Sequence, residues 1–135
     1  MTQNEKDLLI KDLCARLPYK VKVQDTYYKS LEPAPIWLID IHSQKVRMFA
    51  DEGYQSIEYI KPYLFPLSSM TEEQKKELND ITDLDIEIAI SNIKNDTPNY
   101  ITCLNRLNWL LKNHFDIYDL ITVGLANDAT GLNIY

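Results

Sequence analysis

The sequence predicts a domain of the α+β class, in which an N-terminal helix packs on a small curled antiparallel sheet and a helix–strand–helix–helix section follows. Two periodicities carry this prediction. Apolar residues first recur every three or four positions, as in an amphipathic helix, and then every second position from Tyr19, as in a half-buried strand. A chain of 135 residues has about the length of one domain, here with the sub-parts 1–66 (helix plus sheet) and 67–135 (mainly helical).

The first predicted element is an amphipathic helix over residues 4–17, NEKDLLIKDLCARL. Asn4 can cap its N-terminus, acidic residues in the first turn suit the positive end of the helix dipole, and Pro18 ends the pattern. Three leucines spaced by four positions form one apolar stripe: Leu9, Leu13 and Leu17. We expect this stripe to face the core.

Four short strands are predicted between residues 19 and 60. Val21 and Val23 alternate with polar residues in the first strand. IWLIDI and KVRMFA form a hairpin around HSQ, with Val46 and Met48 on one face of the second hairpin strand and Lys45 and Arg47 on the other, and YQSIEYI begins the last strand. Two prolines in LEPAP, residues 31–35, predict an unpaired loop because proline lacks a backbone donor. Short strands joined by tight loops favour a strongly curled sheet or a small SH3-like barrel.

The stretch KPYLFPL, which follows the last strand, is predicted to be a hydrophobic strap that leads from the sheet to the helices. Pro62 and Pro66 are expected to end strand pairing and to hold the strap extended. Three of its side chains are predicted to lie buried between the sheet and the helices 72–80 and 98–113: Tyr63, Leu64 and Leu67.

Helices dominate the predicted second half. Thr71 and Gln74 form a capping box, which starts a helix over 72–80. Three further elements are predicted: an alternating strand over 84–90, the main helix over 98–113, and a short helix that Asp116 caps.

Composition and charge exclude several classes of function. The 14 Lys and Arg against 20 Asp and Glu give a net charge of −6, which argues against general affinity for a nucleic-acid backbone. No basic export signal and no apolar stretch long enough to span a membrane are visible, so a cytoplasmic protein is predicted. Cys14 and Cys103 each lie in an apolar helical pattern, which indicates buried, reduced thiols.

The search for catalytic residues finds no enzyme motif, and no cofactor or metal site is predicted. His42 lies in a predicted turn, and His114 at a helix end is expected to be a structural cap that faces the last carbonyls. One alternative is a metal-assisted enzyme that uses three carboxylates alternating along a predicted strand: Asp83, Asp85 and Glu87. The favoured interpretation of these carboxylates is the solvated face of an amphipathic strand.

The strongest candidate for function is an aromatic and basic face of the predicted sheet. Nine tyrosines are many for this length, and tyrosine combines a large apolar body with a polar tip. SH3-like barrels bind peptides or nucleic acid through exposed aromatic side chains. The candidate interaction surface is Lys20, Lys22, Tyr27, Tyr28, Trp37, Lys45 and Arg47.

Three segments carry a resemblance to a known family: DLLIKDLCARLPYKVKV, IEYIKPYLFPLSSMTEEQKKEL and NRLNWLLKNHFDIYDLITVGLA. Their order and spacing resemble a family of small uncharacterised proteins of Bacteroides-type gut bacteria and of their phages and prophages. The family often has a second histidine where this chain has Asn113. The family has no established activity, so the resemblance implies a shared fold and a mobile-element origin but no catalytic residue.

These observations together predict a non-enzymatic protein-interaction or host-modulating module with an unidentified protein partner. The alternative is a nucleic-acid-binding accessory protein that uses the aromatic and basic face of the sheet. The sequence leaves the partner and the oligomeric state open.

Overall fold

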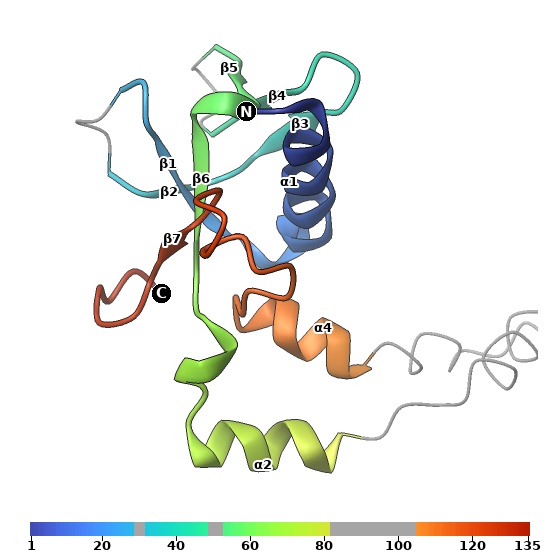
Figure 1. The fold of residues 1–135 in the computed structure, drawn as a ribbon, viewed down its shortest axis with the longest axis vertical. Coiled ribbons are helices and arrows are strands. Elements are labelled where there is room, and N and C mark those ends of the chain that lie inside the picture. The colour runs from blue at the N-terminus through green and yellow to red at the C-terminus, as the bar shows by residue number, and fades with distance from the viewer. Residues whose placement is uncertain (29–31, 49–52, 82–104) are drawn as a thin grey trace, which may run out of the picture.

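The computed structural model describes residues 1–28, 32–48, 53–81 and 105–135, and it confirms the α+β class (Figure 1). The helices are α1 (Gln3–Arg16), α2 (Glu72–Asp80) and α4 (Asn105–Lys112), with short 3₁₀ turns at Leu17–Tyr19, Ile57–Tyr59 and Leu67–Ser69. The strands are β1 (Lys22–Asp25), β2 (Ala34–Pro35), β3 (Leu38–Asp40), β4 (Lys45–Arg47), β5 (Gln55–Ser56), β6 (Ile60–Leu64) and β7 (Asn127–Asp128).

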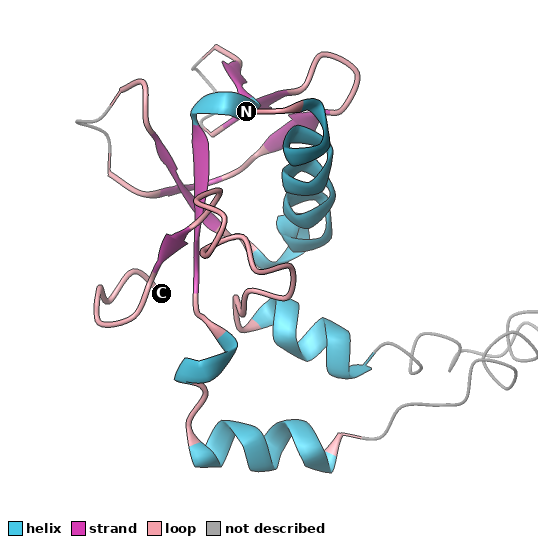
Figure 2. Ribbon diagram, viewed as in Figure 1, coloured by secondary structure: helices cyan, strands magenta, loops and turns pink. Residues whose placement is uncertain are grey.

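The strands form two small sheets (Figure 2). One sheet has the order β2-β1-β6-β7, in which β1 is antiparallel to β2 and β6, and β6 is parallel to β7. The other is the antiparallel sheet β3-β4-β5. The described strands therefore do not close into the SH3-like barrel that was one of the two predicted forms of the sheet.

Two prolines lie inside strands, so the prediction that they prevent pairing is wrong. Pro35 belongs to β2, an edge strand of the described sheet, where proline is tolerated. Pro62 lies in β6 opposite Val23 of β1. The Thr26 N–H donates to the Tyr59 C=O at 2.7 Å, and hydrogen-bonded pairs alternate with non-bonded pairs in an antiparallel ladder. Because Thr26–Tyr59 is a hydrogen-bonded pair, Val23–Pro62, three pairs further along the register, is a non-bonded pair. The N–H that Pro62 lacks would therefore make no hydrogen bond in the ladder.

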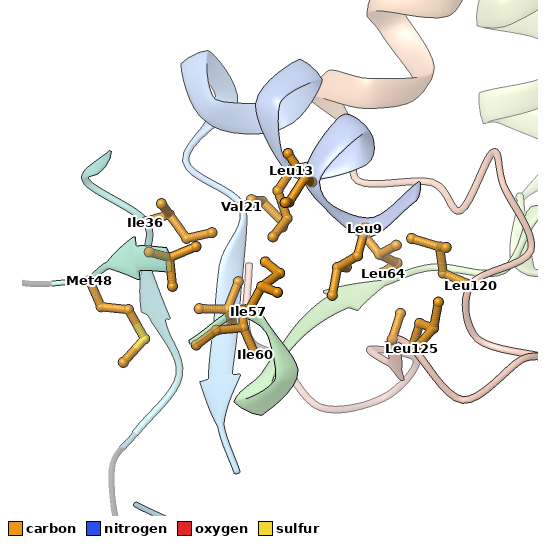
Figure 3. Packing of buried hydrophobic residues seen from close by; sticks show 14 residues of the cluster. Leu9, Leu13, Val21, Ile36, Met48, Ile57, Ile60, Leu64, Leu120 and Leu125 are labelled. Atoms are coloured by element: carbon orange, nitrogen blue, oxygen red, sulfur yellow. The ribbon is translucent and has the colours of Figure 1, made fainter. Parts of the chain in front are cut away.

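The core lies between α1 and the sheets (Figure 3). Leu9 and Leu13 are fully buried, as the predicted stripe requires, while Leu17 is partly buried against the same cluster. Val46 and Met48 are both buried, which confirms the predicted inner face of the second hairpin strand. Figure 3 shows the other labelled members of this core: Val21, Ile36, Ile57, Ile60, Leu64, Leu120 and Leu125.

The predicted strap is only partly confirmed. Leu64 has no exposed surface, but it packs in the α1 cluster near Leu9 and Leu120 rather than between the sheet and the later helices (Figure 3). Tyr63 is half-buried, and Leu67 is 48% exposed, contrary to the prediction. Residues 67–69 form a 3₁₀ turn, held where the Ser69 N–H donates to the Pro66 C=O, so the chain turns away from the core there.

Local signals located two helices well. Thr71 and Gln74 form the predicted capping box at the start of α2. The first helix begins earlier than predicted, because Thr2 rather than Asn4 caps it, in a capping box with Glu5.

The predicted short helix after Asp116 is not formed. The buried Asp116 carboxylate does accept backbone N–H groups, from Tyr118, Leu120 and Ile121, but these bonds hold successive turns. The predicted strand 84–90, the first part of the predicted helix 98–113, and Cys103 lie outside the described residues.

Candidate functional site

One group of exposed aromatic side chains surrounds the end of β1. We call Tyr27, Tyr28, Tyr54 and Tyr59 the tyrosine rim; all four are exposed, and Tyr27 is 61% exposed. The buried Asp25 carboxylate accepts the backbone N–H groups of Tyr27 at 2.8 Å and Tyr28 at 3.1 Å. Its other oxygen accepts the Gln55 side-chain amide at 3.0 Å. Asp25 therefore holds the turn that presents two of the rings.

Tyr27 contacts two other rings of the tyrosine rim, and Tyr54 contacts a cation. Tyr27 meets Tyr28 edge to face, with 4.8 Å between ring centroids, and meets Tyr59 at 5.2 Å. The Arg47 guanidinium lies 5.5 Å from the Tyr54 ring centroid. A hollow of about 380 Å³ lies beside these rings, lined by Asp25, Tyr28, Val46, Met48, Gly53, Tyr54 and Gln55.

The structure brings together only part of the predicted interaction surface. Tyr27, Tyr28 and Arg47 belong to the rim or contact it. Trp37 lies beside Arg47, since its backbone N–H donates to the Arg47 C=O at 2.8 Å, and its side chain is largely exposed. Lys45 is exposed on β4, two positions before Arg47.

The other two predicted lysines lie toward the opposite end of β1. Lys20 follows the 3₁₀ turn at Leu17–Tyr19, and the Lys22 ammonium donates to the Ile134 C=O at 2.6 Å. Lys22 is the first residue of β1, whereas Tyr27 and Tyr28 lie on the turn that follows its last residue, Asp25. The predicted surface is therefore divided into an aromatic part with Arg47 and a separate basic part.

A second aromatic site was not predicted from the sequence. Five rings form a connected cluster where β6 ends near the C-terminal end of α4. His114 stacks on Tyr135 with 3.7 Å between ring centroids and 13° between planes. Phe65 lies 5.9 Å from Tyr135 and 6.2 Å from Phe115, and Phe115 stacks on Trp109 at 5.8 Å.

A cavity of about 460 Å³ opens beside this cluster, and we call it the aromatic pocket. Its lining combines aromatic rings with polar side chains from the start of α2, the end of α4 and the C-terminal segment. The lining residues are Phe65, Ser69, Thr71, Gln74, Lys112, Asn113, His114, Phe115, Thr130, Gly131 and Tyr135. This volume lies within the range of small-molecule sites, about 300–1,000 Å³.

His114 ends α4 in a conformation that usually selects glycine. Its φ is 62°, in the left-handed region. The Phe115 N–H donates to the Leu110 C=O at 3.0 Å, and the His114 N–H donates to the Leu111 C=O at 3.1 Å. These two bonds define a Schellman motif with His114 at the position after the C-cap. A histidine here carries a steric penalty of roughly 1–2 kcal/mol that glycine avoids.

The His114 ring is neutral rather than a charged cap, which corrects the expectation from the sequence. The residue is only 8% exposed, and burial, together with the nearby Arg16 cation, lowers its pKa to about 4. Its Nδ1 atom is buried and has no hydrogen-bond partner in the part of the chain that the structure describes. The backbone of His114 therefore ends the helix, while its ring packs on Tyr135.

An ion pair lies inside the protein between α1 and the end of α4. Arg16 and Asp12 are both fully buried, and Arg16 Nε donates to Asp12 Oδ2 at 2.8 Å. A second Arg16 nitrogen donates to the Phe115 C=O at 2.6 Å, which ties the two helices together. Burial raises the pKa of Asp12, and the hydrogen bond from Arg16 opposes this shift. Their spacing of four residues beside the leucine stripe was a sequence signal for this pair.

Tyr135 joins the aromatic cluster to the larger sheet. Its hydroxyl accepts the Lys22 N–H at 3.0 Å and donates to the Tyr63 C=O at 2.8 Å. Lys22 and Tyr63 are the next pair beyond Val23–Pro62 in the β1–β6 register, so the hydroxyl stands between two strands that no longer pair directly. Burial raises the pKa of the Tyr135 hydroxyl to about 12.

The described residues give little support for metal binding, membrane insertion or a reactive thiol. There, no group of three or more His, Cys, Asp or Glu side chains is arranged to hold a metal ion, and no helix has the length and hydrophobicity needed to cross a membrane. Cys14 is a free, half-buried thiol whose pKa is raised by burial. The carboxylates of the alternative metal site, Asp83, Asp85 and Glu87, lie outside the described residues.

Comparison of the chain with protein-family models, with curated proteins and with solved structures finds no match. The comparisons thus add no evidence for or against the resemblance to the Bacteroides and phage family.

Proposed function

We propose that the chain is a non-enzymatic protein-interaction module that binds an extended peptide segment of a protein partner across the tyrosine rim. The observation that carries this proposal is the exposure of four tyrosine rings, of which Tyr28 and Tyr54 line a hollow. Two of the four, Tyr27 and Tyr28, lie on a turn anchored by buried Asp25. Tyrosine supplies a large contact area at low conformational-entropy cost, and aromatic-lined grooves bind extended peptides. A turn held in place before binding lowers the ordering cost further.

The charge of the chain favours a neutral or basic peptide. The net charge of −6 attracts cationic segments over long range and repels acidic ones. Arg47 is positioned over Tyr54, so its guanidinium belongs to the aromatic surface instead of forming a basic patch with Lys20 and Lys22. A host-modulating role for such a module rests on the resemblance to phage and prophage proteins alone.

Selection from a displayed random-peptide library on the immobilised full chain tests the proposal. Enriched peptides are then measured against the double variant Tyr27→Ser/Tyr28→Ser. We expect these peptides to bind at least about tenfold more weakly to this variant, because truncating two aromatic anchors removes more than the 1.4 kcal/mol that a factor of ten represents.

A matched control removes exposed apolar side chains elsewhere. The double variant Val123→Ser/Leu132→Ser changes two residues that are as exposed as the tyrosines but do not line the hollow beside the rim. It should bind the enriched peptides like the unchanged chain. A library that yields no enriched peptide, or peptides that bind the tyrosine variant equally well, would contradict the proposal.

The nucleic-acid alternative has weaker support, because the four basic residues of the predicted surface do not form one group. It is tested by fluorescence anisotropy with a labelled single-stranded oligonucleotide at 50 and 200 mM salt. Binding that falls steeply with salt and is lost in Lys45→Ala/Arg47→Ala would replace the peptide proposal, since phosphate contacts release counterions.

A further inference from the structure

The aromatic pocket has a composition that suits a particular class of small ligand. Phe65 and Tyr135 line it and keep part of their surface exposed, while Phe115 and His114 also line it but are otherwise buried. Flat aromatic walls favour a planar ring, which can stack on them in an offset or tilted geometry. The cavity is therefore shaped by its side chains for an aromatic ring rather than for an extended chain.

The charges around the aromatic pocket favour an anion. Lys112 is the one lining residue whose side chain carries a formal charge at neutral pH, in a chain whose net charge is −6. Within the part of the chain that the structure describes, its ammonium has no hydrogen-bond or ion-pair partner. Thr71 and Gln74 place the positive end of the α2 dipole at the cavity, whereas the acidic side chains that follow Thr71 do not line it.

One further polar group is available to an anion. The Gln74 side-chain oxygen accepts the Thr71 N–H at 2.9 Å as part of the capping box. This bond fixes the orientation of the amide and leaves its NH₂ group as a donor at the cavity wall. Lys112 and Gln74 come from different helices, so the donors approach the cavity from the end of α4 and from the start of α2.

The strained backbone at His114 is a further indication that this cavity is a ligand site. A left-handed position that glycine or asparagine would occupy more easily holds a buried aromatic side chain instead. Strain of this kind occurs at ligand sites, where the side chain has a role that outweighs its conformational cost. Here the ring backs Tyr135 at 3.7 Å and so fixes the wall on which a ligand ring would stack.

We propose that the aromatic pocket binds a small planar aromatic anion, with its ring against Phe65 and Tyr135 and its carboxylate or phosphate on Lys112 and Gln74. This site is independent of the tyrosine rim, so either proposal can fail without the other. Carboxylate and phosphate share the chemistry that the pocket recognises, namely a negative charge joined to a flat ring.

Isothermal titration of the full chain with indole-3-acetate and with phenyl phosphate tests the proposal, and neutral 3-methylindole serves as the uncharged probe. We expect at least one of the two anions to bind at millimolar or lower concentration and the neutral ring to bind at least about tenfold more weakly. The anion that binds more tightly identifies the preferred head group. No binding by either anion, or equal binding of the neutral ring, would overturn the proposal.

Two variants and a matched control locate the site. Lys112→Gln should weaken the anion about tenfold and leave the neutral ring unchanged, because it removes charge and keeps a polar side chain. Lys76→Gln removes the same charge from an exposed position of α2 outside the lining and should have no effect. Equal losses in both variants would indicate general electrostatics and reject the site.

The stacking wall is tested separately from folding. Tyr135→Phe removes the hydroxyl that bridges Lys22 and Tyr63 but keeps the ring, so binding should stay within about twofold. His114→Asn keeps a residue that tolerates the left-handed backbone but removes the ring behind Tyr135, and it should weaken the anion several-fold. Binding that is unchanged in His114→Asn would show that the strained histidine does not serve this pocket.

Discussion

The tyrosine rim and the aromatic pocket are both built from aromatic side chains, but different parts of the molecule hold them in place. In the rim, one buried carboxylate, Asp25, holds the backbone of the turn, and the rings extend into solvent. In the pocket, rings stack on each other above the buried Arg16–Asp12 pair, and His114 ends α4. Aromatic content alone therefore does not distinguish a surface from a core; the anchoring of the backbone does. Substitutions near the pocket should change stability, whereas substitutions of rim rings should change binding.

The largest loss of stability is expected from a substitution in α1 next to the pocket. Arg16→Ala leaves the buried Asp12 carboxylate and the Phe115 C=O without their donor, and should lower the free energy of unfolding by about 3–5 kcal/mol. Urea unfolding followed by circular dichroism measures this loss. Lys11→Ala is the control on the same helix: Lys11 is exposed and lies over the Tyr118 ring, so its loss should cost about 1 kcal/mol or less. Similar losses in both variants would show that the buried pair does not hold the junction.

The next largest loss of stability is expected in the strap, which lies between the two regions. Leu64→Ala removes a fully buried side chain and should lower stability by about 2–5 kcal/mol. Leu67→Ala, only three residues later, removes a half-exposed side chain and should lower stability by less than about 1 kcal/mol. Thermal melts of the two variants check this contrast. A melting temperature that drops equally in both would place Leu67 in the core.

The buried histidine should make the stability of the protein depend on pH. The pKa of His114 is about 4 in the folded protein and about 6.5 when the chain is unfolded, so the unfolded state binds the proton more readily. The stabilising effect of the neutral ring is fully present above pH 6.5, is lost as the pH falls toward 4, and changes no further below that. After allowance for partial solvent screening, the loss should be about 1–3 kcal/mol.

Comparing the unchanged chain with His114→Asn isolates this effect, because the carboxylates titrate in both proteins. Free energies of unfolding at pH 7 and pH 4.5 should differ less in the variant than in the unchanged chain. If the two proteins lose the same stability between these pH values, the histidine does not titrate with a lowered pKa.

The parts of the fold that the sequence predicted correctly depend on short-range signals. The leucine stripe of α1, the Thr71–Gln74 capping box and the alternation around Val46 each lie within a few residues, and the structure confirms all three. Proline was misjudged because its effect depends on register: Pro62 falls opposite Val23 at a non-bonded position, which only the pairing of two distant segments determines.

The prediction of the candidate sites was limited in the same way, because the sequence indicates short-range patterns but not contacts between distant segments. Tyr27 and Tyr28 were predicted as interaction residues because they are aromatic residues of the predicted sheet, and the structure exposes both rings. The aromatic pocket joins Phe65, His114 and Tyr135 from three distant segments, so no local pattern indicated it. Lys20 and Lys22 were grouped with the tyrosines as one face of the predicted sheet, but β1 separates them, since Lys22 begins the strand and the tyrosines follow its end.

The smallest effect on stability is expected at the rim, and it tests whether the rim is free for binding. Tyr27→Ala removes a ring that is mostly exposed and that contacts the Tyr28 and Tyr59 rings, so it should cost about 0.5–1 kcal/mol. Asp25→Ala is the informative comparison, since it removes the acceptor of two backbone N–H groups and of the Gln55 amide and should cost about 1–3 kcal/mol. Chemical denaturation of both variants measures the contrast. If Tyr27→Ala destabilises the protein as much as Asp25→Ala does, the ring is part of the structural framework, and the tyrosine rim is not a surface left exposed for a partner.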